Sequence, residues 1–113
     1  MTGDICEVVI TAPDEDWLID FTRQLIADKL AAAGHHTKIR TVYTWHGAIE
    51  DTTEWRVALR TRTSHFQAIL DRVIAQHPYE VPSVTAVPII AANPAYGAWI
   101  LDSTQPPDPS TDP

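Results

Sequence analysis

The fold of this chain is decided in its middle, where residues 39–60 read IRTVYTWHGAIEDTTEWRVALR. Apolar and polar side chains alternate in both halves of this stretch, which predicts two β-strands. Gly47 and the polar residues 50–53 predict the turn between them. We therefore expect an antiparallel hairpin with one face on a hydrophobic core. The residues that share a face within each run are Ile39, Thr41, Tyr43 and Trp45 in the first, and Trp55, Val57 and Leu59 in the second.

Before the hairpin, the sequence predicts one strand and one helix. Residues 5–11 are rich in β-branched residues, and Pro13 ends the run. Acidic residues at positions 14–16 suit the first turn of a helix. Apolar residues then recur at helical spacing from Leu18 to Ala33, and Gly34 stands where a helix commonly ends.

After the hairpin, the sequence predicts a helix, a strand and a short helix. Ser64 and Gln67 fit a capping box, and apolar residues follow at helical spacing up to Ile74. This helix should end before Pro78. Residues 84–91 predict a last strand, in which Pro88 indicates an edge position or a bulge. Residues 93–94 (Asn-Pro) predict the start of the final helix.

The predicted order is β-α-β-β-α-β, the ferredoxin-like motif of an α+β fold with an antiparallel sheet. Right-handed crossovers place both long helices on one face and leave the other face open. On that open face we expect Glu7 to pair with Arg56 or Arg60, and another subunit to cover the sheet. Residues 1–103 should form one domain, and residues 104–113 a proline-rich tail without ordered structure.

Composition excludes several classes of function. The chain has 113 residues, which fits one domain, and a net charge of −7, which disfavours nucleic acids and anionic membranes as partners. No apolar run approaches the roughly 20 residues of a membrane span. Cys6 is the single cysteine, so an intrachain disulfide cannot form. We expect a cytoplasmic protein.

Several short motifs occur in order along the chain: TAPD at 11–14, KLAA at 29–32, YTWHG at 43–47 and HPYEVP at 77–82, followed by Tyr96 and Trp99. Together they resemble the CutA family of divalent-cation tolerance proteins over residues 5–101. The resemblance implies a ferredoxin-like homotrimer, built in part through its long hairpin and similar in architecture to PII signalling proteins. It also implies a role in tolerance of copper and other divalent metals, and no enzyme reaction.

The sequence departs from the family at positions that bear on metal chemistry. Ala33 and Ile10 stand where some members have cysteine, and His46 stands where many have glutamine or glutamate. The missing cysteines weaken any thiolate-based copper site, and Cys6 does not replace them by default. Cys6 itself is expected to act as a small hydrophobic residue of a buried strand.

His77 is the main candidate for a metal ligand, because imidazole suits copper, nickel and zinc. Tyr79 and Glu80 follow it in a loop bounded by prolines. One histidine and one carboxylate cannot complete a tetrahedral zinc site, so we expect weak binding or ligands shared between copies. No cofactor is required, and Cu²⁺ or another divalent ion is the expected ligand. Alternatively, the prolines shape a rigid loop in which Tyr79 fills a subunit contact.

The remaining polar candidates are weaker. His35 and His36 point to opposite faces if they lie on a strand, and only an irregular loop would let them bind one ion. The acidic residues near the predicted hairpin tip are expected to be a solvated turn rather than a hard-cation site. Those acidic residues are Glu50, Asp51 and Glu54. The two remaining histidines, His46 and His65, are expected at the surface.

The aromatic residues of the hairpin favour a contact surface. Tyr43, Trp45 and Trp55 are expected to lie near one another and, with Tyr79, to form a subunit contact or a ligand pocket. Two alternatives to metal binding remain: a PII-like sensor of a small molecule or anion, and a trimer that only binds a protein partner. The sensor would use Arg40, Arg60 and Arg62. Catalysis lacks a motif, since no nucleophile elbow or nucleotide-binding glycine loop occurs.

Overall fold

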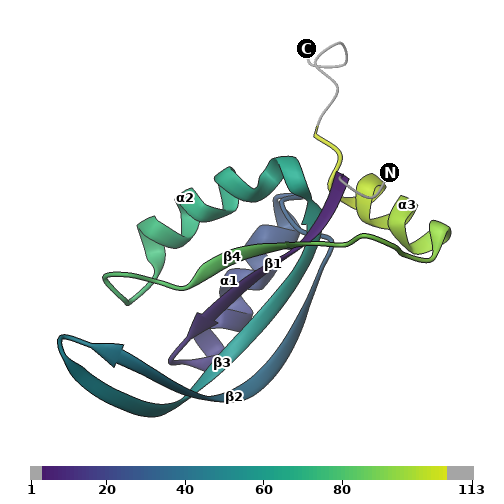
Figure 1. The fold of residues 1–113 in the computed structure, drawn as a ribbon. Helices are drawn as coiled ribbons and strands as arrows, with labels where there is room; N and C mark the ends of the chain where they lie inside the picture. The colour runs from purple at the N-terminus through teal and green to yellow at the C-terminus, as the bar shows by residue number, and fades with distance from the viewer. Residues whose placement is uncertain (1–3, 107–113) are drawn as a thin grey trace.

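The computed structural model describes residues 4–106, and the elements follow the predicted β-α-β-β-α-β order with an added helix (Figure 1). Most of the expected tail lies outside the described residues. The elements are β1 (Ile5–Ala12), α1 (Glu15–Ala27), β2 (Ala33–Trp45), β3 (Ala48–Arg62), the 3₁₀ helix η2 (Thr63–His65), α2 (Phe66–Gln76), β4 (Val84–Pro88) and α3 (Pro94–Ser103).

The four strands form one antiparallel sheet in the order β2-β3-β1-β4, which confirms the ferredoxin-like fold. α1 and α2 pack on the same face of this sheet (Figure 1). The core lies between the two helices and the sheet. It includes side chains from alternate positions of β1 and β3 and from one face of each helix: Val8, Ile10, Val57, Leu59, Leu18, Phe21, Leu25, Ile69 and Val73.

Cys6 belongs to this core and is only 1% exposed. Burial raises the pKa of its thiol, because a thiolate is poorly solvated in an apolar environment. This environment agrees with the expectation that Cys6 acts as a small buried hydrophobic residue.

The opposite face of the sheet carries the predicted ion pair. Glu7 of β1 lies directly opposite Arg60 of β3, and their side chains form a salt bridge. The Arg60 Nη2 also lies 3.2 Å from His35 Nδ1 on β2. Arg56, the other predicted partner of Glu7, lies opposite Thr11 instead.

The end of α1 differs from the prediction. The helix ends at Ala27, and Lys29 turns the chain with a positive φ of 60°. Leu30 therefore lies in the connection, while Ala33 and Gly34 belong to β2. Gly34 is needed for packing rather than for ending a helix: a Cβ at this position would lie 2.6 Å from Thr22 Cγ2 of α1.

The hairpin turn is shorter than predicted. It consists of His46 and Gly47, both with positive φ (48° and 80°), between the paired residues Trp45 and Ala48. Two-residue turns of this handedness match the twist of the strands they join. The polar residues 50–53 therefore lie in β3 and pair with β2. Glu50, Asp51 and Glu54 are therefore not a cluster at the tip. Asp51 is exposed on the hairpin, whereas Glu54 is buried.

Two further boundaries differ in detail. Ser64 lies in η2, and no side chain caps the start of α2, so the predicted capping box does not form. β4 ends at Pro88 instead of residue 91, at the edge of the sheet as the proline indicated. The predicted cap of α3 is confirmed, since the Asn93 side chain accepts a hydrogen bond from Ala95 N at 3.0 Å.

Candidate functional site

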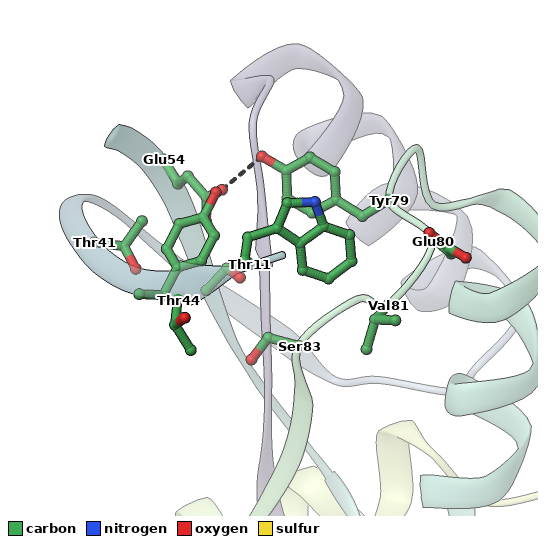
Figure 2. A pocket seen from close by; sticks show the side chains of 10 residues that line it. Thr11, Thr41, Thr44, Glu54, Tyr79, Glu80, Val81 and Ser83 are labelled. Carbon is green, nitrogen blue, oxygen red and sulfur yellow. Dashed lines mark hydrogen bonds between the residues drawn. The ribbon is translucent and has the colours of Figure 1, made fainter. Parts of the chain in front are cut away.

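A cavity of about 510 Å³ lies between the hairpin and the loop that joins α2 to β4. Figure 2 shows Thr41 and Thr44 on the hairpin side, and Tyr79, Glu80, Val81 and Ser83 on the loop side. Its volume is in the range of small-molecule sites. The complete lining is Thr11, Thr41, Tyr43, Thr44, Trp45, Glu54, Tyr79, Glu80, Val81 and Ser83.

The register of the hairpin determines which side chains reach this cavity. Odd-numbered residues of β2 pair with even-numbered residues of β3, so Tyr43 lies opposite Glu50, and Ile39 lies opposite Glu54. Paired residues of neighbouring strands project to the same face of a sheet. Tyr43 and Trp45 therefore share a face with Glu54, away from the helices.

Trp55 lies on the other face of the hairpin. Its neighbour across the strands is Lys38, whose Nζ is 5.9 Å from the centre of the Trp55 ring, and the ring packs against the helix-covered core. The expectation that Trp55 lies beside Tyr43 and Trp45 is therefore wrong. The cause is the two-residue turn, whose register puts Trp55 and Trp45 on opposite faces.

Glu54, which was expected in a solvated turn, is instead a buried carboxylate that lines the cavity. It is 4% exposed, and its Oε2 accepts a hydrogen bond from the Tyr79 hydroxyl at 2.6 Å (Figure 2). Burial raises the pKa of Tyr79 well above its usual value, and the adjacent Glu54 carboxylate raises it further. The phenol therefore stays protonated and holds the loop to the hairpin.

His77 holds the start of the same loop. Its Nε2 lies 2.7 Å from the carbonyl oxygen of Thr11, and its Nδ1 lies 3.0 Å from Tyr79 N. A carbonyl oxygen only accepts and a backbone N–H only donates, so Nε2 carries the proton and Nδ1 accepts. The ring also packs edge-on against Trp17. His77 does not itself line the cavity, whereas Glu80 does.

The other histidines are dispersed. His35 and His36 lie on β2 and, as neighbours on a strand, face opposite sides of the sheet. Burial lowers the pKa of His36, against the opposing effect of Glu15. His46 is in the turn against the Trp45 ring, and His65 precedes α2. Within residues 4–106, no three His, Cys, Asp or Glu side chains are grouped closely enough to hold a metal ion.

The three arginines that an anion sensor would use each contact another group of the same chain through a hydrogen bond or a salt bridge. Arg40 makes a two-pronged contact with Asp51 at 2.9 and 2.7 Å, and Arg60 pairs with Glu7. Arg62 donates to the carbonyl oxygen of Thr104 at 3.2 Å, near the end of α3. These three side chains do not line the cavity.

Comparison with known proteins gives a consistent result. The family described as CutA1 divalent ion tolerance protein matches residues 6–103. "Protein CutA homolog" of Xenopus laevis is 34% identical over 103 residues, and "Protein CutA" of Bos taurus is 32% identical over 112 residues. These matches cover 90% and 98% of this chain, which spans 68% and 64% of the two relatives.

A solved structure agrees with this match. The structure described as the periplasmic divalent cation tolerance protein CutA from Archaeoglobus fulgidus superposes with a TM-score of 0.87 at 30% identity. The superposition covers 89% of this chain and 99% of that one. Among residues 4–106, no helix has the length and apolar character needed to cross a membrane.

Proposed function

This chain belongs to the CutA1 family of divalent ion tolerance proteins, and on that premise we propose that it is a homotrimeric, non-enzymatic protein that binds a divalent metal ion weakly. The metal part of the proposal rests on the orientation of His77. The trimer part rests on the hairpin, whose outer part carries exposed apolar side chains that no other element of the same chain covers.

His77 is oriented as a metal-ligating histidine usually is. Such residues donate one ring N–H to a carbonyl or carboxylate, which fixes the ring and leaves the other nitrogen for the metal. In this chain Nε2 donates to the carbonyl oxygen of Thr11, so Nδ1 is the nitrogen that would bind the ion. Glu80 is three residues further along the same loop and supplies a carboxylate. Cu²⁺ is favoured, because it binds nitrogen and oxygen ligands more tightly than other common divalent ions.

The same geometry explains why the binding should be weak. Nδ1 already accepts a hydrogen bond from Tyr79 N, which a metal ion must displace at a cost of about 1 kcal/mol. One imidazole and one carboxylate also leave coordination positions unfilled. Water or ligands from neighbouring copies must fill them, because residues 4–106 of one chain hold no group of three.

The hairpin supports the assembly. β3 pairs with β1 only from Trp55 to Arg62, so the rest of the hairpin is a two-stranded ribbon that extends beyond the sheet (Figure 1). A ribbon of two strands alone is marginally stable in water. Val42 and Ile49 on this ribbon are 62% and 82% exposed. A second and third copy packed on the ribbon would cover these side chains.

Calorimetric titration of the full chain with Cu²⁺ tests the metal part. We expect saturable binding that His77→Gln removes and Glu80→Gln weakens, while the matched variant His46→Gln in the hairpin turn binds like the unmodified protein. Circular dichroism of each variant checks that the loop change leaves the fold intact. Binding that persists unchanged in His77→Gln, or no saturable binding at all, would contradict the proposal.

Light scattering of the metal-free protein tests the assembly separately. We expect a mass near three subunits, unchanged by one equivalent of Cu²⁺, because the metal would bind a preformed trimer. A monomeric mass in both conditions would refute the assembly.

We also propose a cytoplasmic location, supported by the single cysteine, although the Archaeoglobus fulgidus relative is described as periplasmic. Cell fractionation decides between the two compartments.

A further inference from the structure

The cavity combines aromatic walls with one buried carboxylate that has no cationic partner. Glu54 is 4% exposed, and its hydrogen bond is to the neutral Tyr79 hydroxyl. The ion pairs among residues 4–106 join Arg40 to Asp51, Arg60 to Glu7 and Arg72 to Asp28, so none of them neutralises Glu54. A carboxylate held this far from water without a counter-charge favours a cation beside it.

The remaining lining indicates the kind of cation. Tyr43, Trp45 and Tyr79 offer ring surfaces, which attract cations and pack on hydrocarbon. Thr41 and Ser83 add hydroxyl oxygens that can accept hydrogen bonds from an N–H donor. A hydrated metal ion prefers several oxygen ligands over aromatic rings, and an anion would be repelled by Glu54 and Glu80.

We propose that this cavity binds a small organic ammonium ion. The ammonium group lies against the Glu54 carboxylate, and the attached carbon chain packs on Tyr43 and Trp45. The volume of about 510 Å³ accommodates a ligand of several carbon atoms. This inference goes beyond metal binding: Glu80 lines the cavity, but His77, the residue on which the metal proposal rests, does not, and the ammonium group is held by Glu54.

Calorimetric titration of the full chain with butylammonium chloride tests the inference, in buffer whose ionic strength is matched with potassium chloride. Butanol and butyrate serve as the neutral and anionic analogues. We expect saturable binding of butylammonium and none of the two analogues, because the carboxylate requires a positive charge. Fluorescence of Trp45 and the other tryptophans gives a second signal.

Two variants assign the binding to Glu54. Glu54→Gln keeps an oxygen that can accept the Tyr79 hydroxyl but removes the charge, so it should weaken butylammonium binding by about tenfold or more. Glu50→Gln is the matched control, since Glu50 is on the same face of the same strand but outside the lining. It should bind like the unmodified protein.

Three results would overturn the inference: no saturable binding of butylammonium, equal binding of butanol, or unchanged binding by Glu54→Gln. A cavity already filled by a neighbouring copy would give the first of these. Failure here is distinguishable from failure of the metal proposal, because that proposal is tested with Cu²⁺ and His77→Gln. A protein that binds Cu²⁺ but not butylammonium would leave metal binding standing alone.

Discussion

Replacing Gly34 by alanine tests the close packing between β2 and α1 at this position. The new Cβ would lie 2.6 Å from Thr22 Cγ2, 3.0 Å from Val57 Cγ2 and 3.3 Å from Leu59 Cδ2. None of these neighbours can move away easily. Val57 and Leu59 are fully buried, and the Thr22 hydroxyl is fixed by its hydrogen bond to Leu18 O at 2.8 Å.

The expected loss of stability follows from these contacts. An extra methyl group in a well-packed core costs about 1–3 kcal/mol. The change from glycine to alanine also restricts the unfolded chain, which returns about 0.4–1 kcal/mol. We therefore expect Gly34→Ala to lower the free energy of unfolding by roughly 1–2 kcal/mol. Gly34 does not have a positive φ, so backbone strain adds nothing.

A second substitution isolates the responsible contact. Thr22→Ser removes the Cγ2 atom but keeps the hydroxyl that bonds to Leu18 O, and alone it should cost about 0.8 kcal/mol for the lost methyl group. In the double variant the closest clash is absent, so the two costs should fall short of additivity by about 1 kcal/mol.

Urea unfolding followed by tryptophan fluorescence measures these free energies, at one fixed protein concentration because assembly contributes to stability. Gly97→Ala is the matched control, since its Cβ would meet only Ile5 Cδ1 at 3.9 Å within a helix. It should be neutral or stabilising by about 0.5–1 kcal/mol. The reasoning is refuted if Gly34→Ala is as stable as the unmodified protein, or if Thr22→Ser gives it no relief.

Three other predictions test local features. Asp14→Ala should lower the free energy of unfolding by about 1 kcal/mol in urea, because the Asp14 carboxylate caps α1 with backbone contacts of 2.9 and 3.4 Å; an unchanged midpoint would exclude that role. Gly47→Ala should cost about 1 kcal/mol in the same assay because of its φ of 80°, since no atom lies within 4 Å of the new Cβ, and Gly47→Asn should cost less. Because the pKa of Tyr79 is raised in the fold, its contribution to stability is complete below about pH 10 and is lost as the pH rises further. Glu54→Gln should lower that pKa, so an ultraviolet titration showing no earlier tyrosinate absorbance would contradict the Glu54 contact.

The strand and helix order could be predicted because the periodic patterns are long. Alternation in the hairpin and helical spacing from Phe66 to Ile74 identified the elements, and their order implied which strands are neighbours. That order placed Glu7 beside β3, and the structure shows its salt bridge with Arg60. Long-range pairing was predictable here because the ferredoxin-like topology leaves few alternatives.

The element boundaries that were predicted wrongly depend on tertiary contacts. Apolar spacing continues past the end of α1, so the pattern alone could not show that Lys29 turns the chain. Gly34 is typical of a helix end, and only the proximity of Thr22 explains it inside a strand. The polar residues 50–53 favoured a turn because an exposed ribbon and a loop have similar composition.

The candidate site was partly predictable. Tyr43, Trp45 and Tyr79 were identified as pocket or interface residues, and the structure brings them to one cavity. Trp55 was misplaced because its face depends on the turn length, which sets the register. Glu54 was assigned to the turn, yet the alternation already separated it from the core-facing Trp55 and Val57. With the register known, that signal identifies Glu54 as a cavity residue.

The burial of the single cysteine gives this protein an internal reporter of its own opening. A thiol-specific reagent cannot reach Cys6 while β1 sits in the centre of the sheet, and burial keeps the thiol protonated and unreactive. The labelling rate of Cys6 then reports how often the protein opens enough to expose the central strand. A second cysteine placed on the exposed ribbon would react quickly, so one chain could carry a fast-reacting label there and a slow-reacting thiol that reports unfolding, with the native Cys6 kept in place.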